Sequence, residues 1–256
     1  GSFTRGQAAL ENLVDIYERE SDWAKAIEVH RELEVATGGK SAQLAHYYCE
    51  LAEQARLSGK LDLAREYLKS SVRSETGAFR GTLIRAAIAQ EEEDHAQALR
   101  LYELVLVSDQ RLMVEVLPQL IECYEATGRQ HELERYLEQL IVDGAGINRG
   151  LAYSAIINGL TTPPVLRACV EDFILHHDIM AALIDTEHFR SLPLESREEA
   201  IQRITTALRR LALSSPRYRC TTCGYSPQRL IWHCPSCKAW ETIKPIQAFV
   251  FERLIG

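Results

Sequence analysis

The chain has 256 residues, a formal net charge of −7 and a hydrophobic fraction of 46%. These values are ordinary for a globular chain, and the negative charge argues against a protein that coats nucleic acid. The chain lacks a run of about 18 apolar residues, so no membrane-spanning helix is expected within it. Because Gly1-Ser2 resembles an expression scar, we expect a fragment of a longer protein.

Most of the chain has the periodicity of amphipathic helices. Between about Gln7 and Leu213, apolar residues recur at intervals of three and four. A degenerate helix pair is expected over residues 150–177 and a last helix over Ser196–Leu213. Turn signals at short intervals predict antiparallel helix pairs: Gly38-Gly39, Ser58-Gly59, Thr76-Gly77, Thr127-Gly128 and Gly144.

The helix pairs form a repeat. One position early in each second helix holds Ala26, Ala64, Ala98 and Leu133, at separations of 38, 34 and 35 residues. Larger side chains follow four residues later at His30, Leu68, Tyr102 and Leu137, and Ser21, Gly59, Glu93 and Gly128 lie between the helices. A period near 34 with a small residue at the helix contact resembles the tetratricopeptide repeat. The sequence therefore predicts an all-α fold, with a tetratricopeptide-repeat superhelix over residues 1–213.

Such a superhelix has a concave face lined by the first helix of each pair, and peptides usually bind there in this repeat family. The acidic run Glu91–Asp94 falls in an interhelix turn and is expected to be solvated. The register places eleven partner-binding candidates on the concave face: Glu11, Asp15, Glu18, Arg19, His46, Glu53, Arg56, Arg80, Gln90, Glu122 and Glu125.

Four of the seven cysteines crowd into a short segment, as Cys220-Thr-Thr-Cys223 and Cys234-Pro-Ser-Cys237. Each Cys-x-x-Cys turn aims two thiolates at one centre, so two such turns predict a tetrahedral site for one metal ion. Disulfides are the weaker interpretation, because the sequence is typical of a cytosolic chain and the scattered Cys49, Cys123 and Cys169 are unpaired in sequence and fit helix cores. A thioredoxin-type redox pair is also disfavoured, because it would need a βαβ unit and the sequence pattern predicts none.

Residues 214–247 are predicted to form a small module around this metal, because so short a segment buries too little apolar surface to fold alone. Tyr218, Tyr225, Trp232 and Trp240 are the expected core, and the basic segment is expected to dock on the acidic helices. The cysteine motifs resemble rubredoxin and the zinc ribbons. Lys238 stands where rubredoxins have Gly, and the loop between the cysteine pairs is shorter, so zinc is favoured over iron. Residues 248–256 form a tail.

Helical repeats followed by the segments Arg217–Tyr225 and Trp232–Ile246 resemble the lipopolysaccharide assembly protein B family (LapB, also called YciM) of Gram-negative bacteria. The resemblance implies a non-enzymatic adaptor on the cytoplasmic face of the inner membrane. There the family promotes degradation of the deacetylase LpxC by the protease FtsH, and the regulator LapC (YejM/PbgA) restrains it. It also implies a membrane contact only through an N-terminal helix absent from this chain, and a metal module packed on the repeats. No nucleic-acid partner is expected, because the chain is acidic and the metal module carries little positive charge.

Other functions stay open from the sequence. A rubredoxin-like electron carrier, a nucleic-acid reader and a general interaction scaffold are the alternatives to the adaptor. No enzyme motif is evident: Gly38–Ser41 ends like a phosphate-binding loop, but Glu34 stands where its first glycine belongs. His176-His177-Asp178 lies on a helical pattern and is expected to be surface or core rather than a ligand.

Overall fold

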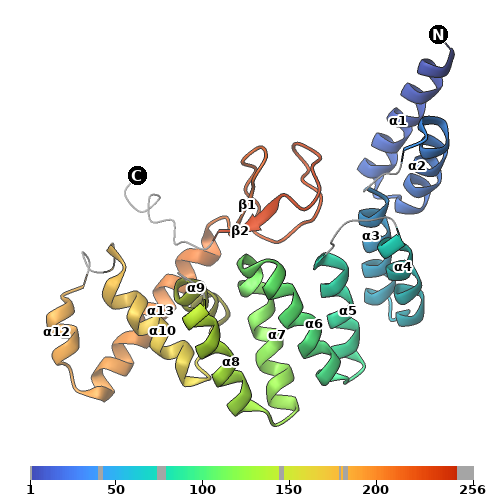
Figure 1. Cartoon of the computed structure of the whole chain (residues 1–256). Coiled ribbons are helices and arrows are strands. Elements are labelled where there is room, and N and C mark those ends of the chain that lie inside the picture. Colours follow the sequence, from blue (N-terminus) through green and yellow to red (C-terminus); the bar gives the residue numbers. More distant parts are fainter. Residues whose placement is uncertain are drawn as a thin grey trace. The chain divides into compact units, whose positions relative to one another are not determined.

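Figure 1 shows the computed structural model of the chain, which describes residues 2–39, 43–73, 79–143, 147–178, 180 and 184–246. The tail 248–256 and the turn signals Thr76-Gly77 and Gly144 lie outside the described residues. The chain divides into two compact units, residues 1–105 and 106–256. Within the described residues, no helix combines the length and the apolar character needed to cross a membrane.

The first unit is built from helix pairs, and the all-α prediction with tetratricopeptide-type repeats is confirmed. Its helices are α1 (Ser2–Glu20), α2 (Trp23–Thr37), α3 (Gln43–Leu57), α4 (Leu61–Arg73), α5 (Phe79–Glu91) and α6 (His95–Ser108), the last of which crosses into the second unit.

The second unit continues the pairs and ends in the cysteine-rich segment. Its elements are the short 3₁₀ helix η1 (Gln110–Leu112), α7 (Met113–Ala126), α8 (Gln130–Asp143), α9 (Ile147–Asn158), α10 (Pro164–His176), α12 (Thr186–Ser191), α13 (Leu194–Ser214), β1 (Tyr218–Cys220) and β2 (Ile243–Pro245). The two strands pair antiparallel, with Cys220 opposite Ile243. The sequence boundary proposed at residues 213 and 214 falls inside this unit, at the end of α13.

The turns between paired helices share one backbone geometry. Ser21, Gly59, Glu93 and Gly128 all have positive φ, between 56° and 73°. In each turn the N–H of this residue donates to the carbonyl three residues earlier, and the following N–H donates to the carbonyl five residues earlier. This is the Schellman termination, which satisfies the last carbonyls of a helix. The repeat pattern in the sequence predicts the same four residues between helices, although two of them are not glycine.

Packing follows the repeat as well. Ala26, Ala64 and Ala98 have no exposed surface, and Leu133 is buried. A methyl side chain at this position lets the paired helices approach closely. In the first unit Leu68, four residues after Ala64, packs in one apolar cluster of α3, α4 and α5 residues. The residues that the repeat aligns are therefore the ones that are buried between the paired helices.

Three local expectations need correction. The acidic run is not merely solvated, because Glu91 pairs with Arg56 and Glu92 pairs with Arg65. The last helix begins at Leu194 rather than Ser196, and Pro193 at its N-cap makes no side-chain capping bond. The sequence analysis also missed α12, which Asp185 caps by accepting a hydrogen bond from the His188 N–H at 2.9 Å.

The shared turn predicts the outcome of adding one methyl group. Gly59→Ala should lower the free energy of unfolding of the first unit by about 1–2 kcal/mol, because an L side chain is disfavoured at this φ of 73°. A Cβ at Gly59 would meet no atom within 4 Å, so only the backbone conformation is tested. The matched control is Gly6→Ala in α1, which also meets nothing and should be neutral or slightly stabilising. Urea unfolding followed by circular dichroism measures both; equal stabilities would contradict the prediction.

Candidate metal centre

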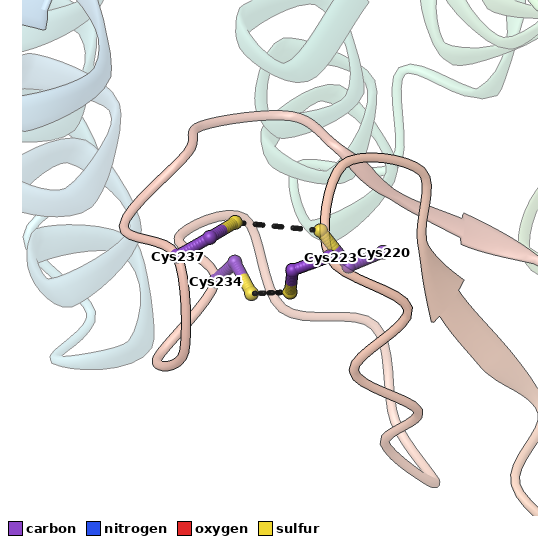
Figure 2. Close-up of side chains that lie close together, drawn as sticks. All are labelled: Cys220, Cys223, Cys234 and Cys237. Atoms are coloured by element: carbon purple, nitrogen blue, oxygen red, sulfur yellow. Dashed lines mark hydrogen bonds between the residues drawn. The ribbon is translucent and has the colours of Figure 1, made fainter.

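Four sulfur atoms converge at the end of the second unit. Figure 2 shows Cys220 and Cys223 facing Cys234 and Cys237. The Sγ atoms of Cys220 and Cys237 lie 3.6 Å apart, and those of Cys223 and Cys234 lie 3.7 Å apart. All four Sγ atoms lie within 4.8 Å of one another, and no other such cluster of possible ligands occurs in the described part of the chain.

These distances suit a metal ion rather than disulfides. A disulfide would bring two sulfurs to about 2.05 Å, and all four cysteines are free thiols. A zinc ion with thiolate ligands at about 2.3 Å holds neighbouring sulfurs about 3.8 Å apart. The observed separations are close to that spacing. The four side chains therefore fit one tetrahedral ion, which would supply the positive charge that thiolates require.

The two Cys-x-x-Cys pairs lie in two separate turns that have the same backbone geometry. The Gly224 N–H donates to the Cys220 carbonyl at 3.0 Å, and the Lys238 N–H donates to the Cys234 carbonyl at 2.9 Å. Gly224 and Lys238 both have positive φ, 79° and 61°. Lys238 therefore takes the same left-handed conformation as Gly224, although it is not glycine. The departure noted in the sequence leaves the turn intact.

The thiols differ in their readiness to ionise. Burial raises the pKa of Cys220, but hydrogen bonds from the Thr242 hydroxyl and nearby backbone N–H groups outweigh it and lower the pKa to about 5. The Ala239 N–H lowers the pKa of Cys237, yet burial and the neighbouring sulfurs raise it to about 12. Without a cation, one thiolate thus opposes ionisation of the next. A divalent ion removes this conflict because it attracts every sulfur.

The core of the module differs from the expected one. Tyr218 and Ile243 pack with Cys220 and Cys234 in a small apolar cluster. Tyr225 does not belong to it, since 40% of this residue is exposed. Trp240 instead stacks on His233, with ring centres 4.4 Å apart. Four buried residues are a small core, which is why the metal must contribute to folding.

The module docks on α7 and η1 of its own unit. The Tyr218 hydroxyl donates a hydrogen bond to Glu115 of α7. Lys244 of β2 makes an ion pair of 3.1 Å with Asp109, and both side chains are largely buried. Asp109 also accepts hydrogen bonds from Arg111. Although burial raises the pKa of Asp109, the hydrogen bonds from Arg111 and Lys244 hold it below its ordinary value.

Several partner-binding candidates make internal contacts. Glu18 is buried and accepts a 2.7 Å hydrogen bond from Tyr47. Arg80 is 2% exposed and forms an ion pair of 2.8 Å with Glu50. Their predicted place on an exposed face is therefore wrong, because each side chain points into the packed helices.

The other nine candidates all keep some exposure. Arg56 pairs with Glu53 as well as Glu91, and Gln90 accepts a hydrogen bond from Tyr102 at 2.9 Å. Partner binding by these surface residues stays a prediction. Half-buried or exposed candidates are Glu11, Asp15, Arg19, His46, Glu53, Arg56, Gln90, Glu122 and Glu125.

The remaining cysteines and the histidine pair follow the sequence expectation. Cys49, Cys123 and Cys169 are buried. His176 is paired with Asp172 on the exposed side of α10 at 2.8 Å, and His177 packs on the Phe173 ring with centres 4.7 Å apart. These residues are packing and surface groups, separate from the sulfur cluster.

Comparison with known proteins agrees with the geometry. Residues 218–245 match the family profile described as rubredoxin metal binding domain. Lipopolysaccharide assembly protein B of Escherichia coli K12 is 30% identical over 243 residues, covering 93% of this chain and 62% of that relative. The Haemophilus influenzae protein of the same name is 27% identical over 255 residues, covering 93% and 61%. The chain thus spans less than two thirds of these relatives. The resemblance to lipopolysaccharide assembly protein B is confirmed as homology.

Loss of one metal ligand should unfold the metal module without unfolding the helical repeats. Cys223→Ser should release the bound ion and unfold the module, because an ion held by three thiolates no longer offsets the weak core. The helical circular dichroism should stay largely intact, since the repeats pack through their own apolar residues. Elemental analysis and circular dichroism measure the two effects. Thr222→Ala, which changes an exposed neighbour, is the control; loss of most helical signal in Cys223→Ser would contradict two separable modules.

The docking contact predicts a smaller effect. Tyr218→Phe should lower the free energy of unfolding of the second unit by about 1–2 kcal/mol, because half-buried Glu115 loses a hydrogen-bond donor. Metal content should not change. Tyr225→Phe, which alters an exposed hydroxyl of the same module, should have no effect. Denaturant unfolding followed by tryptophan fluorescence gives both values, and equal loss in the two variants would rule out the contact.

Proposed function

We propose that this chain serves lipopolysaccharide assembly as a non-enzymatic adaptor. In this proposal it promotes degradation of the deacetylase LpxC by the protease FtsH at the cytoplasmic face of the inner membrane. LapC (YejM/PbgA) restrains it, and a preceding membrane helix holds it there. The observation that carries the proposal is the similarity over 93% of the chain, because a match of that length includes residues of both units.

The architecture supports an adaptor. Repeated helix pairs with one turn geometry form a regular scaffold, and such scaffolds commonly bind peptide segments. The metal module is fixed to α7 by Tyr218, which contacts Glu115, and to the N-cap of η1 by Lys244, which pairs with Asp109. Its loops are therefore held at a defined place on the second unit, as a docking surface requires. This arrangement suits the binding of another protein.

Zinc is the proposed ion. The four-thiolate donor set binds zinc or iron, and the short loop between the cysteine pairs separates the module from rubredoxins. A colourless protein that contains one zinc ion per chain is the expected result of elemental analysis. A red protein that contains iron and bleaches reversibly on reduction would favour the electron carrier instead.

The half-life of LpxC tests the adaptor proposal. Cells that lack the endogenous protein are complemented with the full-length parent, as wild type, Cys223→Ser or Thr222→Ala. Wild type and Thr222→Ala should restore rapid turnover of LpxC, whereas Cys223→Ser should not, because its module is unfolded. If wild type fails to shorten the half-life, the adaptor function is wrong for this chain.

A further inference from the structure

A groove runs between the end of α13 and the loops of the metal module, within the second unit. Its volume is about 720 Å³, which lies in the range of ligand-binding cavities. Leu213 and Tyr225 contribute exposed apolar surface, with 48% and 40% of each residue accessible. Pro227, Ile231 and Pro235 complete the apolar part. The docking contacts with Glu115 and Asp109 use none of these five residues.

Two guanidinium groups line the same groove. They belong to Arg217 and Arg229, and none of the described residues that line the groove is acidic. The concentration of positive charge is notable in a chain of net charge −7. This charge does not serve the docking contacts of the module, where Tyr218 donates to Glu115 and Lys244 pairs with Asp109.

Arg217 is held in position before any ligand arrives. Its Nε donates to the Gln228 carbonyl at 3.1 Å, and its guanidinium carbon lies 5.6 Å from the centre of the Tyr218 ring. Because Tyr218 belongs to the buried core of the module, this guanidinium rests on a fixed surface. A preorganised cation loses little conformational freedom when it pairs with a carboxylate.

We propose that this groove, here named the arginine groove, binds an extended acidic segment of a partner protein. Carboxylates of the segment pair with Arg217 and Arg229, and an apolar side chain packs against Tyr225 and Pro235. Arginine and tyrosine are among the residues that are enriched at protein interfaces. The inference deepens the adaptor function and rests on it for its biological meaning, since it identifies the chemistry of a docking segment.

The metal maintains the groove. Tyr225 follows Cys223 by two residues, and Pro235 lies between Cys234 and Cys237. Both cysteine turns therefore contribute to the lining of the groove, and the ion holds these turns together. A segment that binds here senses the metal-loaded state of the module.

Two other occupants of the arginine groove are considered, a nucleic acid and the chain's own C-terminal residues. A nucleic acid would gain affinity mainly from many phosphate contacts, which two arginines in an acidic chain do not provide. The chain's own residues after Ile246 are the second alternative, because the Ile246 N–H donates to the carbonyl of Arg217, a residue that lines the groove, at 2.8 Å.

Fluorescence anisotropy with the metal-loaded full chain tests the proposal. The probe is a fluorescein-labelled peptide in which glutamates alternate with proline and phenylalanine, and a second peptide has lysine at every glutamate. The acidic peptide should bind and the lysine peptide should not. Arg229→Glu should weaken binding at least about tenfold, because it replaces an attraction by a repulsion. Arg203→Glu makes the same charge change on an exposed part of α13 outside the groove and should alter affinity less than about twofold.

Four results would overturn the proposal: no binding of the acidic peptide, equal weakening by Arg229→Glu and Arg203→Glu, displacement of the peptide by single-stranded DNA, or binding only after truncation at Ile246. The last result would assign the groove to the chain's own tail. Binding of the peptide is measured without LpxC, so the two proposals fail independently. A parent protein that restores LpxC turnover without peptide binding would overturn the groove alone, and the reverse would overturn the adaptor alone.

Discussion

Attraction between a metal ion and four thiolates is the constraint on which the end of the chain depends. The sulfurs of Cys220 and Cys237 approach to 3.6 Å, a separation at which two negative charges repel strongly without a cation. The ion joins the two Cys-x-x-Cys turns, each of which is closed by its own backbone hydrogen bond. Once joined, they bury Tyr218 and Ile243 and bring β1 beside β2. The docking contacts to α7 follow from that pairing.

The helical repeats depend on a different and purely local device. Their turns end one helix and start the next through two backbone hydrogen bonds and one residue of positive φ. Ser21 and Glu93 adopt this conformation without being glycine, so the surrounding helix pair must stabilise it. The first unit is thus held by packing and turns, whereas the module is held by coordination. Loss of the ion should leave the repeats folded.

Features set by short-range chemistry were predictable from the sequence. The four ligands follow from the Cys-x-x-Cys spacing, and Ala26, Ala64 and Ala98 follow from a repeat of small residues. Even the docking of the basic module on acidic helices was foreseen, although Asp109 and Glu115 were not named. Each of these inferences needs only a local pattern or a net charge.

Features set by distant partners were not predictable. Glu18 and Arg80 look like surface residues on a helical wheel, yet Tyr47 and Glu50 hold them inside. Glu91 and Glu92 look solvated until Arg56 and Arg65 are seen to reach them. Tyr225 looked like core because it is aromatic, but the module is too small to enclose it. The division between residues 105 and 106 has no composition signal.

Hydrogen exchange of the metal-loaded protein and of the protein treated with a chelator tests the central claim most directly. The informative amides are those of Cys220, Thr221 and Cys234, which donate to Tyr225, Thr242 and Ala239. If coordination holds the module together, chelation should bring their exchange close to unfolded rates while the amides of α3 and α4 stay protected. Unchanged protection of Cys220, Thr221 and Cys234 after removal of the ion would contradict the account.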